Sequence, residues 1–381
     1  MRIAILTDGI WPYRVGGMQK HSYYLVKYLA RNGVAVDLYH LNDSERDISK
    51  LEFFTDEEKK NIRSFVFTFP NKGKWPWHYI SESKAYSKML YEQFKKNGPV
   101  DFIYAKGYTA WYFIKQKLAG VKLPPIGIRL HGYEIFQPSS SLLTKYRNVL
   151  YKPLVNFLNK NADFIYSYGG GITDVIKQNI PASENRIIEV PTGIEKEWIY
   201  KENNNVNTPL RFAFLGRYDV RKGVKELSAA LKNLVGKNEF EFHFVGPIPE
   251  EFKIASPQIK YHGAISDAEK IKNVLRQTDV FVLPSHTEGM PNVIMEAMAS
   301  GCAVLATNVG AVGVLVTEEN GWLIPPLSSQ AIESKISEIL KADTRIIGNK
   351  KAASVEKAES TFLWDEIVKV EISAIKKAIG K

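Results

Sequence analysis

The chain has a single cysteine, Cys302, among its 381 residues. One thiol excludes an internal disulfide, and this is typical of proteins from a reducing compartment. Cys302 lies in the apolar run SGCAVLA, so we expect it to be a buried small hydrophobic residue. The N-terminal run MRIAILTDG is too short for a signal-peptide core, and it predicts a first buried strand of a cytoplasmic protein.

Long uncharged runs are scarce as well. Residues 297–316 are twenty positions without a charge, which is long enough to span a membrane. Glycines and polar residues interrupt this segment, among them Gly301, Thr307 and Gly310. They favour a helix end, a short strand and a turn over one continuous helix. We therefore expect no transmembrane segment.

Several signatures of phosphate and nucleic-acid binding are missing. The chain has no G-x-G-x-x-G and no G-x-x-x-x-G-K-[ST], so neither a dinucleotide fingerprint nor a P-loop is indicated. It also lacks a zinc-ligand set, an RNA-binding signature and a long basic run. Despite the net charge of +10, we expect no nucleic-acid partner.

The positive charge is concentrated in the first half of the chain. Residues 1–200 hold 28 Lys and Arg against 19 Asp and Glu, whereas residues 201–381 hold 23 against 22. Such asymmetry indicates that the first half meets an acidic partner, such as phosphate groups or an anionic membrane face.

Short apolar runs alternate with longer amphipathic stretches in both halves. RIAILT and DFIYA are examples from the first half, and RFAFLG and VFVLPS from the second. This alternation predicts βαβ units and parallel sheets. The polar stretch KENNNVNTP, residues 201–209, predicts a linker. We expect an α/β fold of two Rossmann-like, doubly wound domains, residues 1–200 and 201–362, facing each other across a cleft.

Two loops at expected strand ends carry groups suited to phosphate. Gly16 and Gly17 stand where a helix begins, and paired glycines there let the backbone approach an anion. Arg217 and Lys222 follow the run RFAFLG just before a helix, where two cations could hold a diphosphate. Taken singly, each loop is also compatible with an ordinary turn or with solvated surface charge.

Two carboxylates, Glu288 and Glu296, lie eight positions apart in EGMPNVIME, just after VFVLPS. Pro291 suits the first position of a helix between them. The acids could accept hydrogen bonds from hydroxyl groups. The free backbone amides of this stretch could face a phosphate; they are those of Gly289, Met290, Asn292 and Val293. A ligand with both groups is a nucleotide sugar. A glycosidase with two catalytic carboxylates is an alternative, and so is a pair of acids that only stabilises a helix start.

Together these stretches resemble the retaining GT-B glycosyltransferases of the family-four group, also called glycosyl transferases group 1. The resemblance covers nearly the whole chain in order, and the E-x7-E block with the Arg and Lys loop is its most specific part. Thr192 stands where the family often has Asn. The motifs are GGMQKH (16–21), RLHG (129–132), PTGIE (191–195), LGRYDVRKG (215–223), YHGAIS (261–266), EGMPNVIME (288–296), NGWLIPP (320–326) and the ending FLWDEIVKVEISAIKKA.

The resemblance implies a role for each motif residue. Glu288 would contact hydroxyls of the transferred sugar, and Glu296 would bind the ribose hydroxyls. Arg217 and Lys222 would neutralise the diphosphate leaving group, and His131 would contact the donor sugar near the reacting centre. The other donor-binding residues would act mostly through their backbone: Gly16 and Gly17 at the diphosphate, and Gly289, Met290, Pro291 and Asn292 along the sugar and phosphate.

The chemistry that the resemblance implies retains the anomeric configuration. Leaving group and acceptor would share one face of the sugar, and a β-phosphate oxygen would take the acceptor's proton. The chain has no D-x-D triplet, which is the metal–diphosphate clamp of the other major glycosyltransferase architecture. We expect no metal and no cofactor, since the nucleotide sugar is a substrate. A non-transferring relative, such as a sugar-nucleotide epimerase or a binding-only homologue, remains the alternative.

The first domain would receive the acceptor, which we expect to be a saccharide or a lipid-linked saccharide in cell-surface polysaccharide or glycolipid synthesis. Basic and aromatic residues mix in residues 71–86 and 142–160, which suits peripheral contact with the inner, anionic membrane face. A solvated basic helix face is the alternative. A C-terminal helix, about residues 363–381, is expected to pack back on the first domain through Trp364, Val368, Ile372, Ile375 and Ile379.

Overall fold

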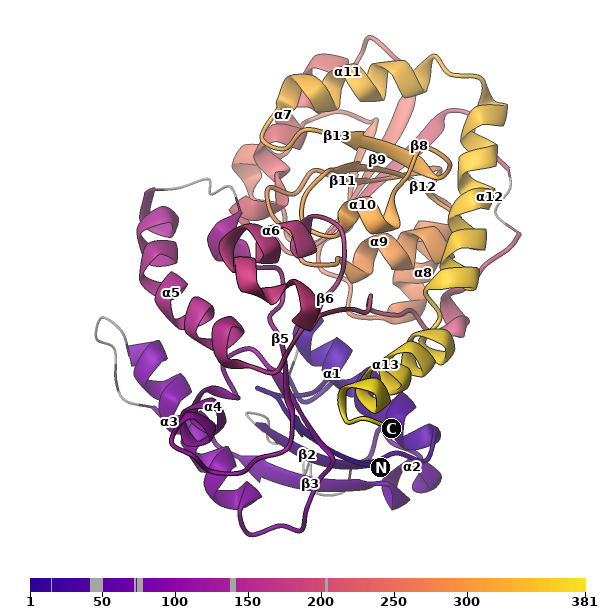
Figure 1. Cartoon of the computed structure of the whole chain (residues 1–381). Helices are drawn as coiled ribbons and strands as arrows, with labels where there is room; N and C mark the ends of the chain where they lie inside the picture. The colour runs from indigo at the N-terminus through magenta and orange to yellow at the C-terminus, as the bar shows by residue number, and fades with distance from the viewer. Residues whose placement is uncertain (15, 42–50, 72, 74–77, 138–141, 203–204) are drawn as a thin grey trace.

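The computed structural model describes the chain except residues 15, 42–50, 72, 74–77, 138–141 and 203–204. It has two parallel sheets, one built from each half of the chain, with helices packed around them (Figure 1). The predicted architecture of two Rossmann-like domains is thereby confirmed. The exact boundary at residue 200 stays a prediction, although the last strand of the first sheet ends at Glu189 and the second sheet begins at Leu210.

The first sheet is seven-stranded with the order β3-β2-β1-β4-β5-β6-β7. Its strands are β1 (Arg2–Leu6), β2 (Ala35–Leu41), β3 (Ile62–Phe67), β4 (Phe102–Lys106), β5 (Ile126–Arg129), β6 (Phe164–Ser167) and β7 (Ile187–Glu189). The helices that connect them are α1 (Gly17–Arg31), α2 (Asp56–Lys60), α3 (His78–Phe94), α4 (Trp111–Leu118), α5 (Leu142–Asn161) and α6 (Gly171–Asn179).

The second sheet is six-stranded with the order β10-β9-β8-β11-β12-β13. Its strands are β8 (Leu210–Leu215), β9 (Phe240–Val245), β10 (Ile259–Tyr261), β11 (Val280–Leu283), β12 (Ala303–Thr307) and β13 (Gly321–Ile324). The helices are α7 (Val224–Leu234), α8 (Ala268–Arg276), α9 (Asn292–Ala299), α10 (Val312–Leu315), α11 (Ser329–Leu340), α12 (Thr344–Thr361) and α13 (Trp364–Ala378).

The apolar strands are buried on both faces, as parallel sheets require. In β1, Ile3 and Ile5 belong to one core cluster, while Ala4 and Leu6 belong to the other. Successive strand side chains point to opposite faces, so helices must cover both. Within the described residues, no helix is long and apolar enough to cross a membrane. Cys302 is fully buried as expected, and its Sγ donates to the Leu275 carbonyl at 3.2 Å.

Both sheets reverse their strand order beside their first strand. β1 pairs with β2 on one side and β4 on the other, and β8 pairs with β9 and β11. The connections leave toward opposite faces at such a point and open a crevice beyond the carboxyl ends of the strands. The loops after β1, β8 and β11 therefore stand at these crevices, and these loops carry most of the predicted site residues.

Helix α13 returns to the first domain and lies against α1 (Figure 1). Trp364 starts the helix, is 1% exposed, and stacks on Tyr28 with ring centroids 5.8 Å apart. Val368 and Ile375 are buried as predicted, whereas Ile372 and Ile379 are only partly buried. The sequence pattern missed Glu371, which α13 buries on the same side.

The predicted linker is attached to the second domain by a buried ion pair. Lys351 of α12 and Asp279 lie 2.9 Å apart, and both side chains are 0% exposed. Asp279 also accepts from the backbone amides of Asn207 and Arg211, and Lys351 donates to the Asn205 carbonyl at 2.6 Å. Residues 203–204 of the linker lie outside the described part of the chain. The pair thus joins α12, β11 and the entry to β8.

Replacing Lys351 by alanine should strongly destabilise the second domain, because it leaves the Asp279 carboxylate buried without its counter-charge. Loss of one partner of such a pair costs about 3–5 kcal/mol. Denaturant unfolding followed by tryptophan fluorescence measures this. Arg345→Ala on the same helix is the control, since its ion pair with Asp343 is exposed to solvent and should contribute little to stability. Equal losses in the two variants would contradict the assignment.

Candidate active site

The two domains touch through backbone at the predicted site. A Cβ placed on Gly289 would lie 3.1 Å from the Gly132 nitrogen, and a Cβ on Gly132 would lie 3.3 Å from the Gly289 nitrogen. The loop after β5 thereby meets the loop after β11 with no side chain between them. A side-chain hydrogen bond adds to this contact, because Gln137 Nε2 donates to the Glu288 carbonyl at 2.9 Å. His131 and Glu288, the residues that precede these glycines, are brought to the same place.

Lys222 and Glu288 form an ion pair within the second domain. Lys222 ends the short 3-10 helix Val220–Lys222 after β8, and its Nζ lies 2.6 Å from Glu288 Oε1. Ser285 donates its hydroxyl to the same oxygen at 2.7 Å. The resemblance implied separate roles for the two residues, one at the diphosphate and one at the sugar. The structure joins them, so one ammonium group lies between the two expected positions.

Glu296 is also paired, with a cation from the opposite domain. Lys20 on α1 contacts Glu296 on α9, and the Lys20 ammonium stands 5.5 Å above the ring of Trp198. A small hollow, partly open to solvent, borders this ion pair. It is lined by Lys20, His21, Tyr24, Thr192, Gly193, Ile194, Glu195, Trp198, Asn292 and Glu296. The PTGIE turn (residues 191–195), with Thr192 in place of Asn, thus lines one side of this hollow.

The predicted glycines lie at the start of α1. Gly16 caps the helix and Gly17 is its first residue. A Cβ on Gly16 would stand only 2.2 Å from Gln19 Oε1, and one on Gly17 would be 3.9 Å from Asn292 Nδ2. The start of α1 therefore lies beside the start of α9 in the other domain, near enough for both to contact one ligand.

The structure does not bring Arg217 into this cluster. Arg217 is exposed, and no ion pair involves it within the described residues. Its neighbour Arg221 takes a position at the domain boundary instead. Arg221 pairs with Asp219 at 2.9 Å and contacts Glu134 of the first domain. The assigned diphosphate role of Arg217 stays a prediction, and Arg221 is a residue that the motif alone did not single out.

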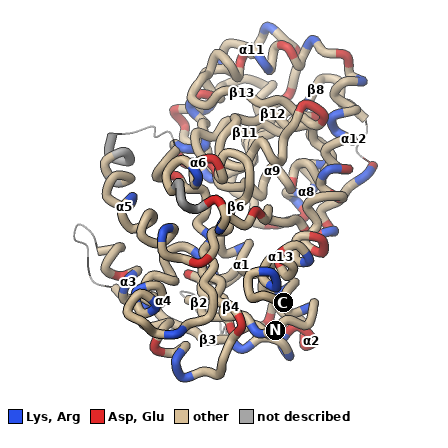
Figure 2. The backbone as a smooth tube through the Cα atoms, in the orientation of Figure 1, with Lys and Arg blue, Asp and Glu red and all other residues tan. Residues whose placement is uncertain are grey.

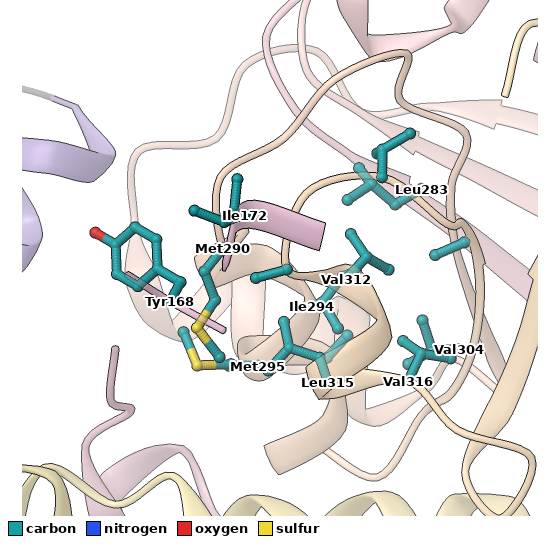
Figure 3. Packing of buried hydrophobic residues seen from close by; sticks show 14 of the residues in the cluster. Tyr168, Ile172, Leu283, Met290, Ile294, Met295, Val304, Val312, Leu315 and Val316 are labelled. Atoms are coloured by element: carbon teal, nitrogen blue, oxygen red, sulfur yellow. The ribbon is translucent and has the colours of Figure 1, made fainter. Parts of the chain in front are cut away.

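The segment between the two acids has one difference from expectation. Pro291 is the cap of α9, with extended backbone angles, and is not the first helical residue, which is Asn292. Met290 directs its side chain into the apolar cluster between the domains, beside Tyr168 and Ile172 (Figure 3). Its sulfur accepts from the Thr192 amide at 3.3 Å. The buried Met290 side chain thus anchors the backbone of residues 289–292.

His131 is held by a second layer of polar residues. Its Nδ1 lies 2.7 Å from the Tyr168 hydroxyl, and its ring packs edge-on against His21, with centroids 5.7 Å apart. Burial, followed by the charges of Lys106 and Arg129, lowers the pKa of His131 well below its ordinary value. The imidazole is therefore neutral at neutral pH and can donate or accept a hydrogen bond, but does not contribute a positive charge.

Two fully buried basic side chains lie beneath the histidines, and the sequence reasoning missed both. Burial lowers the pKa of Lys106 well below its ordinary value. Lys106 Nζ lies 2.6 Å from His21 Nδ1, and Arg129 lies 3.3 Å from Glu371 of α13. Each basic residue ends an apolar strand, β4 or β5. A charged residue inside an otherwise apolar strand is the signal that could have found them, since buried charges are rare unless paired.

The arrangement can hold a ligand that carries both negative charge and hydroxyl groups. Lys222 and the start of α1 offer positive charge, while the carboxylates of Glu288 and Glu296 can accept hydrogen bonds from hydroxyl groups. Within the described residues, no group of three or more His, Cys, Asp or Glu is placed to hold a metal ion. The individual role of each residue stays a prediction.

Family models match both halves of the chain. Residues 15–198 match the model described as Glycosyltransferase Family 4, and residues 209–342 match the one described as Glycosyl transferases group 1. Among curated relatives, CapM, a capsular polysaccharide biosynthesis glycosyltransferase of Staphylococcus aureus, is 28% identical over 54% of this chain. The match spans 60% of CapM. An uncharacterised glycosyltransferase of Methanocaldococcus jannaschii is 24% identical over 88% of both chains.

Solved structures share the fold over the full length. Sucrose-phosphate synthase from Thermosynechococcus elongatus superposes with a TM-score of 0.79 at 19% identity, covering 100% of this chain and 99% of the other. HepE of Anabaena in complex with UDP-glucose gives 0.66 at 17% identity, with 99% and 100% covered. With a matching family model on each half and the two-domain fold in common, the chain belongs to the family-four, group 1 glycosyltransferases of GT-B fold.

Proposed function

We propose that this protein is a retaining glycosyltransferase that moves a hexosyl unit from a UDP- or GDP-sugar to a saccharide or lipid-linked acceptor. The observation that carries the proposal is the pair of ion pairs where the two domains meet: Lys222 with Glu288 in the second domain, and Lys20 of the first domain with Glu296 of the second. These pairs offer cations for phosphate and carboxylate oxygens that can accept hydrogen bonds from hydroxyl groups. In this proposal, each donor-binding residue has the role that the family resemblance implies for it.

The Lys222–Glu288 pair supports a mechanism without a protein nucleophile. Glu288 Oε1 already accepts from both Lys222 and Ser285, which orients the carboxylate and lowers its reactivity toward a sugar carbon. The carboxylate is then suited to hold sugar hydroxyls. A β-phosphate oxygen would take the acceptor's proton while Lys222 stabilises the charge that develops on the leaving diphosphate. Preorganised charge of this kind is usually the largest protein contribution to such a step.

Positively charged groups of the protein would neutralise the diphosphate, which a metal ion does in the other major glycosyltransferase architecture. Lys222 and the start of α1 at Gly16 and Gly17 would face the diphosphate, and Arg217, whose exposed side chain lies outside the cluster, would join them when the donor binds. We therefore propose a metal-independent reaction. Closure of the two domains around the donor would exclude water from the leaving group.

The relatives support the substrate class. CapM is named for capsular polysaccharide synthesis, and HepE was crystallised with UDP-glucose. A relative from Campylobacter jejuni, 26% identical over 80% of this chain, is named for a diphospho-undecaprenol acceptor. These names favour a nucleotide-sugar donor and a lipid-linked saccharide acceptor in cell-surface polysaccharide or glycolipid synthesis.

Membrane contact is proposed for the helices of the first domain. Lysines lie on α3, α4 and α5 (Figure 2), and Tyr146 and Val149 of α5 are 65% and 60% exposed. Aromatic and aliphatic residues beside lysines suit an anionic lipid surface. Part of the basic–aromatic stretch 71–86, namely residues 72 and 74–77, lies outside the described residues, as do the side chains of residues 142–145 and 147.

A panel of UDP, GDP, ADP and their common hexose derivatives, followed by thermal unfolding with and without EDTA, tests the donor site. One nucleotide should raise the unfolding temperature, and a ligand at a hundred times its Kd stabilises by about 2.7 kcal/mol. The shift should survive EDTA. Product analysis then distinguishes transfer or slow hydrolysis from formation of an epimer. A shift without either reaction would indicate a binding-only homologue, and no shift at all would contradict the donor site.

Lys222→Ala should lower turnover by about 10²-fold or more at saturating donor, by analogy with the removal of one preorganised donor. Nucleotide release from the donor found in the panel measures this effect. Lys225→Ala is the matched control, because Lys225 is exposed on the next helix and should leave turnover unchanged. Near-normal turnover of Lys222→Ala would contradict its role at the diphosphate.

Sedimentation with vesicles tests the membrane proposal. The protein should sediment with phosphatidylglycerol vesicles at low salt, remain in solution with neutral phosphatidylcholine vesicles, and be released at high salt as charges are screened. Tyr146→Ser combined with Val149→Ser should weaken the sedimentation. A protein that stays in solution with the anionic vesicles at low salt would contradict the proposal.

A further inference from the structure

Tyr168 and His131 come from equivalent positions on adjacent strands. Arg129 at the end of β5 is in register with Tyr166 of β6. Two residues further along each strand stand His131 and Tyr168, at the same edge of the sheet. There the Tyr168 hydroxyl lies 2.7 Å from His131 Nδ1. The hydroxyl points away from the apolar cluster that holds the tyrosine ring against Met290 (Figure 3).

The direction of this hydrogen bond follows from the partners of the phenol. The Arg129 guanidinium stands 4.8 Å from the centre of the Tyr168 ring, so it contacts the ring. Within the described residues, His131 Nδ1 is the hydrogen-bond partner of the Tyr168 hydroxyl. A phenol that accepted from His131 would leave its own buried hydrogen without an acceptor, so the hydroxyl donates to Nδ1. Burial raises the pKa of Tyr168 to about 12, so the hydroxyl keeps its hydrogen at neutral pH.

Arg129 is itself fixed in place. Its guanidinium donates to the Val190 carbonyl at 2.8 Å and to Glu371 Oε2 at 3.3 Å. The Arg129 and Glu371 side chains are 0% and 2% exposed. Because α13 supplies Glu371, the last helix of the chain holds the group that orients Tyr168. Glu371 thus binds Arg129, Arg129 packs on the Tyr168 ring, and Tyr168 is hydrogen-bonded to His131.

The other ring nitrogen of His131 has no protein partner. His131 Nε2 is shielded from solvent and makes no hydrogen bond to any residue that the structure describes. A neutral imidazole whose Nδ1 accepts a hydrogen bond carries its proton on Nε2. A buried donor without an acceptor is costly, and such groups in native proteins are commonly completed by a ligand or water. The contact between Gly132 and Gly289 places the His131 backbone beside the loop of Glu288.

We propose that Tyr168 is a positioning residue that holds His131 as the Nε2–H tautomer, so that this N–H is the donor to a hydroxyl oxygen of the transferred sugar. The sugar contact rests on the function proposed above, whereas the tautomer is a property of the protein alone. His131 then acts as a neutral hydrogen-bond donor in the reaction. Neither a general base nor a cationic imidazolium is needed at this position.

The tautomer can be measured in the nucleotide-free protein by long-range ¹H–¹⁵N correlation of the imidazole rings. The His131 signals are those that disappear in His131→Asn. We expect wild-type His131 to carry its proton on Nε2 and Tyr168→Phe to shift it toward a mixture of tautomers. Tyr166→Phe is the matched control, because its buried hydroxyl makes no hydrogen bond among the described residues and its ring also packs on Arg129. An Nδ1–H or charged His131 in the wild-type protein overturns the proposal, as does an unchanged His131 spectrum in Tyr168→Phe.

A double-mutant cycle tests the link to the reaction. The readout is nucleotide release from whichever of UDP-glucose, UDP-galactose, UDP-N-acetylglucosamine and GDP-mannose reacts fastest. Tyr168→Phe should lower kcat/KM about tenfold, as expected for one neutral hydrogen bond, and should cause no further loss in the His131→Asn background. Equal losses in both backgrounds would overturn the positioning role. If none of the four sugars reacts with the wild-type protein, the proposed function fails, while the NMR result still decides whether Tyr168 sets the tautomer.

Discussion

The close approach of the two domains depends on glycine at the loops that meet. Gly132 and Gly289 touch through backbone atoms, and Gly310 in the next loop has a φ of +57°, with the Glu288 carbonyl 2.0 Å from where its Cβ would be. A side chain at any of these positions would push the loops apart. With glycine there, Glu288 and His131 are held on either side of one narrow space, and the positions of the other charged groups follow from it.

Within that space the charged groups are already matched to one another. Lys222 pairs with Glu288 inside the second domain, and Lys20 of the first domain pairs with Glu296 of the second. A nucleotide sugar would replace one set of partners with another, because its phosphates meet the lysines and its hydroxyls meet the carboxylates. The reorganisation at binding is then limited to polar groups that are oriented beforehand, which is the condition under which electrostatic stabilisation is most effective. The Lys20–Glu296 pair also links domain closure to the position where the ribose is expected.

The second layer beneath the site is built from parts of the chain that are distant in sequence. Lys106, Arg129 and Tyr168 end three different strands or lie just beyond them, while Glu371 comes from the last helix. Trp364 fixes that helix against α1 through stacking on Tyr28. The C-terminal helix therefore does more than cover an apolar face, because it carries the counter-charge for a cation buried under His131. Few of these groups meet solvent, so their hydrogen bonds act in a medium of low polarity and hold their geometry firmly.

The architecture follows from the pattern of apolar and polar residues along the chain. Continuous apolar strand runs separated by amphipathic helices require parallel sheets covered on both faces, and every predicted strand formed, since burial on two faces leaves little freedom in such runs. It also indicated that Lys222 and Glu288 follow strands at the carboxyl edge of one sheet, and the family resemblance added His131. Their shared role at one ligand stays a prediction. Tertiary structure alone decided the partners. Lys20 lies 276 positions from Glu296, and Arg129 lies 242 positions from Glu371. A periodic pattern reports which face of an element is buried, but it carries no information on which distant charge will lie opposite, because that depends on how two domains and a returning helix pack together.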